Sequence, residues 1–459
     1  MRMSLLGTGV RTPFVLHGLA DREHELGLTE VVLHDTDPAR LDVMATLGAD
    51  LCRSWGAGFA IRSERQLSKA LAGSSFVFSA IRVGQEEARA LDEEVPLKYG
   101  VIGQETTGPG GFAMALRTIP AVLEIARVIE QVAPDALLVN FTNPVGIVMQ
   151  ALHDHAAVRA VGICDGPVSM KRSVAELLGV PGDELRVDYF GLNHCGWVHR
   201  VQTAGRDRLP EVLDRYEELQ SLDEAWRLFD PGFVRSLGML PMEYLYFYYS
   251  REQAVDHIVR SGSTRGRQIA SLNAGLWPEL SERIVAGDLH GARATWERVM
   301  DARDETYFAR ERGEDVPDRI DASPAAIAEM FEGEGYEGMA TAVMQAAVQR
   351  RSSSLILNTA NRGAIHGLRD DDVVEVSCLM DAHGPQPLAQ GTIPDAARLL
   401  LQQVKAYERL TVRAAVEGSY DAALEALLMH PLVGSYPLAR SILDAYLSMH
   451  GASLAHIAR

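Results

Sequence analysis

Two residues in the middle of the chain, Cys164 and His194, have side chains that commonly bind divalent metals. Cys164 follows a short apolar run and precedes Asp165. His194 lies in Gly191-Leu192-Asn193-His194, within a strand-like stretch at 187–201. Two such ligands leave a divalent metal with several open positions, which the hydroxyls of a sugar could fill. A buried core thiol and a hydrogen-bonded core histidine are the alternative interpretations.

The N-terminus carries a pattern typical of dinucleotide binding. Gly7 and Gly9 follow a short apolar segment, and Asp35 lies 28 residues after Gly7. In nucleotide-binding domains such a turn approaches the pyrophosphate, and an acid at this distance accepts hydrogen bonds from the ribose. The third glycine of the usual fingerprint is missing, so a plain tight turn is the alternative. We expect Gly7, Gly9, Val10, Arg11 and Asp35 to bind the cofactor, and the acid favours NAD over NADP.

Five short apolar runs precede these and other polar residues. Continuous apolar runs of this length suit strands buried on both faces of a parallel sheet. In such sheets ligands bind at the carboxyl ends of the strands. Here those ends carry a glycine pair, Asp35, Arg82, Asn143 and Cys164. The sequence therefore predicts a Rossmann-type, doubly wound α/β domain at 1–165, with one continuous site at the sheet edge. The expected strands are 3–6, 31–33, 76–80, 137–141 and 160–163.

Length and composition restrict the remaining possibilities. A chain of 459 residues is long enough for two domains, and we expect a second, mixed α+β domain at 166–459. A net charge of −18 argues against nucleic acid and anionic membranes as partners. Four cysteines do not form a disulfide framework, which favours a cytoplasmic location. No apolar run reaches the ~20 residues of a membrane span. We expect strands at 186–202 and 372–380, helices at 394–416 and 437–449, and an insertion or lid at 205–235.

Several motifs give the chain a resemblance to a known enzyme family. The chain resembles glycoside hydrolase family 4, whose members depend on NAD and a metal, and within it the 6-phospho-β-glucosidases most. The motifs run through most of the chain, and the segment with Gln104-Glu105-Thr106 is the most specific. They are 7–13, 81–84, 99–111, 140–144, 163–167, 191–194, 241–245 and 357–365.

The resemblance implies a lactate/malate-dehydrogenase-like fold and an elimination mechanism. Bound NAD⁺ takes a hydride from C3 of the sugar, which makes the C2 proton acidic. A base removes that proton, the metal stabilises the enediolate, and the C1–O bond breaks. Water then adds at C1 and NADH returns the hydride. Most glycosidases instead use a pair of carboxylates.

The resemblance also assigns roles to residues near the metal. Cys164 and His194 match the metal ligands, with Mn²⁺ or another divalent ion as the metal. A thiolate is soft for Mn²⁺, so we expect modest affinity. Tyr244 matches the base that takes the C2 proton, and it needs a metal or a cation nearby because its ordinary pKa is near ~10. The aromatic run at 246–249 makes core packing the alternative role for Tyr244.

Other matched residues face the substrate. Asn143, Arg89 and Glu105 match residues that contact the sugar. Arg265 lies where the family binds the 6-phosphate, and planar arginine suits that task. A solvated loop is the alternative for Arg265. Asp165 also matches a position that faces the substrate. The β-specific enzymes usually have Asn at this position, whereas the 6-phospho-α-glucosidase branch has Asp, as this chain does.

The function expected from these features is hydrolysis of 6-phospho-β-glucosides, by a homodimer or homotetramer. A family 4 enzyme of another specificity, α-specific or acting on unphosphorylated glycosides, is the first alternative. A simple NAD-linked dehydrogenase is the second. A binding protein without activity is a third, but such a protein has no use for two metal ligands and a base.

Overall fold

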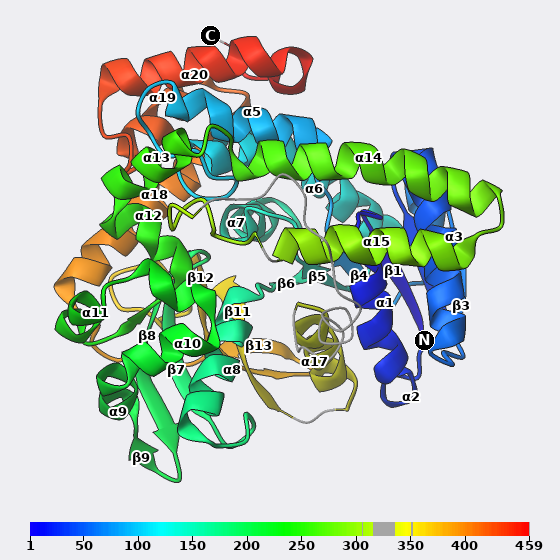
Figure 1. Cartoon of the computed structure of the whole chain (residues 1–459), viewed down its shortest axis with the longest axis horizontal. Helices are drawn as coiled ribbons and strands as arrows, with labels where there is room; N and C mark the ends of the chain where they lie inside the picture. Colours follow the sequence, from blue (N-terminus) through cyan, green and yellow to red (C-terminus); the bar gives the residue numbers. More distant parts are fainter. Residues whose placement is uncertain (305, 315–335, 350–351, 459) are drawn as a thin grey trace.

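The computed structural model describes residues 1–304, 306–314, 336–349 and 352–458, and Figure 1 shows the arrangement of the chain. Its centre is a 13-stranded sheet. The first six strands are parallel in the order β3-β2-β1-β4-β5-β6, which is the order of dinucleotide-binding folds. They are β1 (Arg2–Leu6), β2 (Glu30–His34), β3 (Ala60–Ser63), β4 (Phe76–Ser79), β5 (Leu137–Asn140) and β6 (Arg159–Gly162).

The sheet continues beyond β6 with antiparallel strands from the second part of the chain. Asn358 of β11 pairs with Gly162 of β6, and the order from there is β11-β12-β7-β8-β10. Strands β6 and β7 are consecutive in the sequence, yet β11 and β12 lie between them in the sheet. These strands are β7 (Arg186–Leu192), β8 (Cys195–Thr203), β9 (Arg206–Asp207), β10 (Leu240–Pro241), β11 (Ser353–Ala360), β12 (Val373–Asp381) and β13 (Gly384–Pro387).

Helices cover the sheet on both faces. Alternate residues of the parallel strands belong to two separate apolar clusters, as Leu5 and Leu6 do in β1 and Phe78 and Val77 do in β4. Each face is therefore buried beneath its own helices, which explains the continuous apolar runs. In Figure 1, α14 and α15 lie side by side above the parallel strands. The helices are α1 (Thr12–Asp21), α2 (Glu23–Leu26), α3 (Pro38–Ser54), α4 (Leu67–Leu71), α5 (Gln85–Leu97), α6 (Pro109–Val132), α7 (Val145–His155), α8 (Gly166–Leu178), α9 (Leu209–Asp214), α10 (Tyr216–Leu222), α11 (Pro231–Leu237), α12 (Tyr246–Tyr249), α13 (Arg251–Arg260), α14 (Arg265–Val285), α15 (Leu289–Asp304), α17 (Tyr336–Gln349), α18 (Asp395–Glu417), α19 (Tyr420–Met429) and α20 (Tyr436–His450), with short 3₁₀ turns at η1 (Glu224–Leu228), η2 (Glu243–Leu245) and η3 (Gly451–Leu454).

The turn after β1 requires glycine. Gly7 has φ = +90°, and a Cβ there would lie 2.5 Å from the carbonyl oxygen of Ala80. Only glycine therefore lets the chain pass the end of β4 before α1 begins. At the end of β2, Asp37 caps α3 by accepting hydrogen bonds from the backbone N–H groups of Ala39 and Arg40. Both turns deliver their residues to the carboxyl edge of the sheet.

The five strands predicted for the first 165 residues are confirmed within one or two residues. Strand β3 was not predicted, because it lies at the sheet edge and most of its residues are exposed. The strands expected at 186–202 are confirmed as β7 and β8. His194, which we placed within the strand-like stretch at 187–201, lies instead in the two-residue turn between them.

The polar segment at 205–235 folds into short helices. Tyr216 and Trp226 are buried there, and their rings meet edge to face. Its role as a lid and the domain boundary at 165/166 stay predictions. In the part of the chain that the structure describes, no helix is both long and apolar enough to cross a membrane.

Candidate active site

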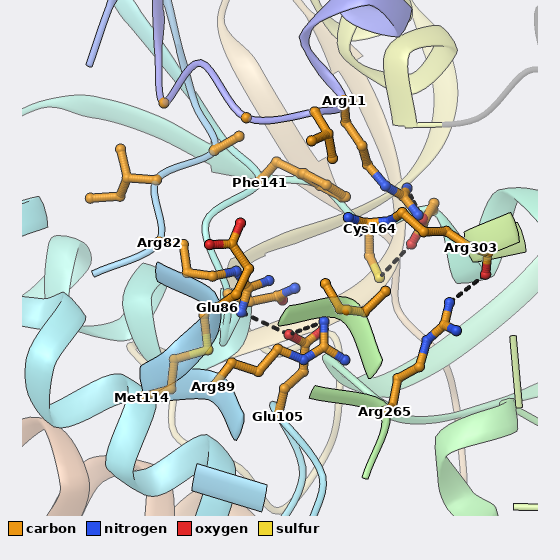
Figure 2. Close-up of a pocket in the computed structure, with 18 of the residues that line it drawn as sticks. Arg11, Arg82, Glu86, Arg89, Glu105, Met114, Phe141, Cys164, Arg265 and Arg303 are labelled. Atoms are coloured by element: carbon orange, nitrogen blue, oxygen red, sulfur yellow. Dashed lines mark hydrogen bonds and ion pairs between the residues drawn. The ribbon is translucent and has the colours of Figure 1, made fainter. Parts of the chain in front are cut away.

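A cavity of about 1120 Å³ runs along the carboxyl ends of the parallel strands. Figure 2 shows part of it, with side chains pointing inward from the segments that follow β4, β5 and β6 and from α5, α6, α14 and α15. Every residue that the sequence predicted for a site lines this one cavity. They are Gly7, Gly9, Val10, Arg11, Asp35, Arg89, Glu105, Asn143, Cys164, Asp165, His194, Tyr244 and Arg265.

Asp35 has the geometry of a ribose acceptor. One carboxylate oxygen accepts hydrogen bonds from the backbone N–H of Thr8 at 2.7 Å and from its hydroxyl at 3.1 Å. The other accepts from the N–H of Asp37 at 2.8 Å. These bonds fix the carboxylate beside the turn that contains Gly7 and Gly9. The second oxygen, Oδ1, still has lone-pair capacity for a ribose hydroxyl, so the residues present fit a dinucleotide.

Cys164 and His194 meet at the other end of the cavity. The Sγ of Cys164 lies 3.5 Å from the Nε2 of His194. Two ligands of one divalent metal, with bonds of about 2.1 and 2.3 Å and angles of about 90–110°, lie about 3.1–3.6 Å apart. The pair therefore fits a shared metal ion. Among the described residues no group of three or more metal-binding side chains is formed, which leaves coordination positions for a substrate.

Hydrogen bonds fix which nitrogen of His194 faces the cavity. The Gln104 Oε1 accepts from the backbone N–H groups of Thr106 and Thr107, at 2.7 and 2.6 Å. That oxygen also accepts the hydroxyl proton of Thr106 at 3.0 Å. The Thr106 oxygen must then accept, not donate, in its 2.6 Å bond with the Nδ1 of His194. The ring proton of His194 is thus on Nδ1, and the lone pair of Nε2 points toward Cys164.

The protonation states of the two ligands follow from their burial. Burial lowers the pKa of His194 to about 4, so the ring is neutral and able to bind a metal near pH 7. Burial, with Glu375 and Asp165 nearby, raises the pKa of the Cys164 thiol. A metal must therefore displace the thiol proton as it binds. The backbone of His194 has φ = +61°, which the β7–β8 turn imposes.

Tyr244 lies directly against the metal pair. Its ring stacks on the ring of His194, with centroids 3.7 Å apart and planes 1° from parallel. Its hydroxyl is 3.1 Å from that of Tyr307. Burial, with Glu243 and Glu105 nearby, raises the pKa of Tyr244 well above its ordinary value. Tyr244 therefore needs a nearby positive charge to act as a base, and a metal held by His194 would supply one.

Two arginines surround Glu105 on one wall of the cavity. In Figure 2, Arg82 and Arg89 converge on its carboxylate, with nitrogen–oxygen distances of 2.8 and 3.0 Å. Although burial opposes ionisation, Arg82 and Arg89 bring the pKa of Glu105 down to about 2. Arg89 also pairs with Glu93 at 2.9 Å. Glu105 is therefore a fixed carboxylate, suited to accept hydrogen bonds from sugar hydroxyls.

Arg265 begins α14 and belongs to a cluster of cations, so the solvated-loop alternative is wrong. Its guanidinium donates to the side chain of Gln268 at 2.8 Å and to the backbone carbonyl of Arg303. Figure 2 shows Arg11, Arg265 and Arg303 on the same side of the cavity.

The electrostatics of this cluster favour an anion. Burial and the neighbouring Arg89 lower the pKa of Arg265 to about 10. Burial and the neighbouring Arg11 and Arg265 lower that of Arg303 to about 9. Within the described ranges, neither Arg265 nor Arg303 forms an ion pair with a carboxylate, although Asp304 and Glu311 line the same wall. A buried group of like charges is relieved by a bound anion.

Asn143, Asp165 and Arg11 lie between the two ends of the cavity. The Oδ1 of Asn143 is buried without a hydrogen-bond partner among the described residues, as expected of an amide that waits for a ligand. Arg11 approaches Asp165 at 3.7 Å. Its side chain therefore points toward the metal pair, whereas we expected a role at the cofactor. Its place in cofactor binding stays a prediction.

Sequence reasoning missed several residues of the cavity. Thr106 was part of a matched motif, but nothing in the sequence showed that its hydroxyl would reach His194. Glu243 also lies in a matched motif, at 241–245, but the sequence assigned it no role. Arg303 and Tyr307 lie in a charged segment that resembles an exposed helix, so only the fold reveals them. Cys52 and Cys195 are buried thiols that do not line the cavity.

Known proteins resemble this chain over most of its length. At the level of the fold, a malate dehydrogenase from Plasmodium falciparum is similar, with a TM-score of 0.50 at 11% identity, covering 91% of this chain and 98% of that one. A "probable 6-phospho-beta-glucosidase" from Bacillus subtilis is 33% identical over 450 residues, which are 96% of this chain and 94% of the relative.

Solved structures show the same similarity. The 6-phospho-β-glucosidase of Thermotoga maritima, in a structure with manganese, NAD⁺ and glucose-6-phosphate, has a TM-score of 0.80 at 26% identity and covers 98% of each chain. A 6-phospho-α-glucosidase from gut microorganisms, in complex with NAD and Mn²⁺, has a TM-score of 0.80 at 28% identity and also covers 98% of each chain.

Two family models together match most of the sequence. One, described as "Family 4 glycosyl hydrolase", matches residues 3–180. The other, described as "Family 4 glycosyl hydrolase C-terminal domain", matches residues 189–433. The chain belongs to glycosyl hydrolase family 4.

Proposed function

We propose that this enzyme hydrolyses 6-phospho-β-glucosides by NAD-dependent oxidation at C3, elimination across C1 and C2, addition of water and re-reduction. The observation that carries the proposal is one cavity that unites three parts. These are a nucleotide-type turn with Asp35, the Cys164–His194 pair under Tyr244, and the arginine cluster around Arg265. No nucleophilic carboxylate is needed for such a cycle.

Different groups in the cavity would carry out different steps of this cycle. When bound, NAD⁺ would exchange a hydride with C3 and the divalent metal would polarise the neighbouring sugar oxygens. Tyr244 removes the C2 proton, and the bond between its hydroxyl and Tyr307 aligns it. Asn143 and Glu105 hold sugar hydroxyls, since one has an unused buried oxygen and the other is a fixed carboxylate.

The 6-phosphate would occupy the arginine cluster. Arg265 and Arg303 have mostly neutral hydrogen-bond partners and repel one another, so a dianion there gains charge-assisted hydrogen bonds. The β-anomer is supported by the Bacillus subtilis relative at 33% identity. Asp165 supports the α-specific alternative, because a similar residue marks that branch.

The location and assembly of the enzyme stay predictions. A cytoplasmic site suits the four free cysteines. The homodimer or homotetramer rests on the resemblance alone.

A panel of 4-nitrophenyl glucosides tests the proposal. We would assay both anomers, with and without a 6-phosphate, in the presence of NAD⁺ and Mn²⁺. Nitrophenol release from the phosphorylated β-anomer, lost after removal of metal and nucleotide, is the expected result. Equal activity with unphosphorylated substrates would contradict the phosphate site, and preference for the other anomer would reassign the enzyme to the α-branch. Net NADH production in proportion to product would indicate a dehydrogenase.

A further inference from the structure

Two glutamates of the cavity experience opposite environments. Glu105 lies between Arg82 and Arg89 and is a permanent carboxylate. Glu243, which precedes Tyr244, forms no ion pair with a lysine or arginine of the described residues and instead faces Asp165, Asp223 and Glu375. Where the surroundings shift the pKa values of two titratable groups in opposite directions, one group commonly acts as an acid and the other as a base.

The Glu243 carboxyl sits beside the metal-binding segment. It packs on Gly166, the first residue of α8, which follows Cys164 and Asp165 in sequence. A Cβ at Gly166 would lie 2.8 Å from the Oε1 of Glu243 and 2.6 Å from the terminal methyl of Met242. The missing side chain at Gly166 therefore makes the space that the carboxyl occupies. Glu243 and Tyr244 both line the cavity that contains Cys164 and His194.

Burial, together with Asp165, Asp223 and Glu375, raises the pKa of Glu243 to about 8. The side chain is thus a neutral carboxylic acid at pH 7 and holds a proton that it can donate. Tyr244 cannot serve as this donor in the same step, because it is accepting the C2 proton. Glu105, another carboxyl that lines the cavity, has no proton to give.

We propose that Glu243 is the acid that protonates the departing glycosidic oxygen. The role rests on the proposed glycosidase function. After oxidation at C3 and loss of the C2 proton to Tyr244, the electron pair left at C2 forms the C1=C2 bond. The C1–O bond breaks, its electron pair stays on the leaving oxygen, and the proton of Glu243 completes the alcohol. The Glu243 carboxylate then takes a proton from the water that adds at C1, while Tyr244 returns a proton to C2.

Glu243→Gln tests this role, because the amide keeps the size and neutrality of the acid without its proton. The substrates are methyl and 4-nitrophenyl 6-phospho-β-glucosides. Methoxide is a poor leaving group and needs the proton, whereas nitrophenolate leaves without it. We expect kcat/KM to fall by roughly 10²–10⁴ for the methyl glucoside, the usual effect of a positioned acid, and by less than about fivefold for the nitrophenyl glucoside.

Two further variants strengthen the test. Gly166→Ala, at a backbone position that is not left-handed, should displace the carboxyl and give a smaller loss in the same direction. It also decides the matter if the glutamine variant does not fold. Glu94→Gln is the control. The Glu94 carboxylate pairs with Arg267 and does not line the cavity. Its loss should not make the enzyme sensitive to the leaving group.

Deuterium exchange separates failure of this inference from failure of the proposed function. In D₂O, the Glu243→Gln variant should still exchange hydrogen at C2 of unreacted methyl glucoside, because Tyr244 and the oxidation at C3 are intact. If the unmodified enzyme places no deuterium at C2, the proposed function itself is wrong. If the unmodified enzyme does place deuterium at C2, but kcat/KM of the Glu243→Gln variant falls equally for both substrates or for neither, the role of Glu243 is overturned.

Discussion

Replacing Thr106 with Val should weaken metal binding without disturbing the fold. Valine keeps the β-branched shape of threonine but cannot accept the Nδ1 proton of His194. The ring is 7% exposed, so no solvent replaces the lost acceptor in the metal-bound state. In the metal-free variant the ring can instead move its proton to Nε2, which faces the cavity. The penalty therefore falls mainly on the metal-bound form.

The magnitude follows from the cost of an unpaired buried donor. That cost is about 1–3 kcal/mol, which corresponds to a Kd for Mn²⁺ that is about 5 to 150 times higher. The range overlaps the ~10–100-fold effect usual for partners of metal ligands. Titration followed by electron paramagnetic resonance measures it directly, because the spectrum of free Mn²⁺ disappears on binding.

Thr106→Ser is the matched control, since it keeps the hydroxyl, and its Kd should stay within about threefold of the original. NAD⁺ affinity, measured on the same samples, reports on the fold of the distant nucleotide turn. An unchanged Mn²⁺ affinity in the valine variant would refute the assigned tautomer of His194. An equal loss in both variants would show that the methyl packing, and not the hydrogen bond, is responsible.

Four other predictions concern separate parts of the molecule. Asp35→Asn should raise the Kd for NAD⁺ by about 10- to 100-fold and reduce discrimination against NADP⁺, as measured by calorimetry, because a charged acceptor for the ribose is lost. Tyr244→Phe should lower turnover by roughly 10²–10⁴ and abolish deuterium incorporation at C2; ordinary turnover would remove Tyr244 from its role. Arg265→Ala should weaken binding of phosphorylated glucosides by about 2–4 kcal/mol, measured as a higher KM. The control Arg267→Ala removes only surface ion pairs with Glu87 and Glu94, so it should leave that KM unchanged. Burial lowers the pKa of His430 to about 3, so near pH 6.5 the unfolded chain binds a proton that the native state does not bind. The free energy of unfolding should therefore fall by up to about 1.4 kcal/mol per pH unit below pH 6.5. His430→Asn should reduce that pH dependence, as measured by urea titrations.

The sequence was most informative where local pattern determines structure. The parallel strands are short apolar runs because both faces are buried, and each run is followed by the residue that it delivers to the cavity. Gly7 and Asp35 could be identified for the same reason, since strand, turn and acid follow one another in a fixed order. Strand β3 escaped notice because an edge strand with exposed residues lacks that pattern.

The sequence was least informative where distant segments meet. The bond between Thr106 and His194 joins residues from the α6 entrance and the β7–β8 turn, and no local pattern encodes it. The strand-like stretch around His194 hid a tight turn because its residues on both sides are apolar. The arginine cluster combines Arg265 of α14 with Arg303 of α15. The family resemblance identified Arg265, but in sequence Arg303 looks like an ordinary surface charge.

The strand order has a consequence for biosynthesis. Cys164 and His194 are 30 residues apart in sequence and meet in the cavity. The strands that lie between β6 and β7 in the sheet, β11 and β12, are translated much later. A nascent chain that already contains every predicted ligand therefore still lacks the sheet that aligns them. Pairings between such distant segments slow folding, because a long loop must close before they form. The metal centre should accordingly mature only after most of the chain has left the ribosome, and fragments that end before β11 should not bind metal at this site.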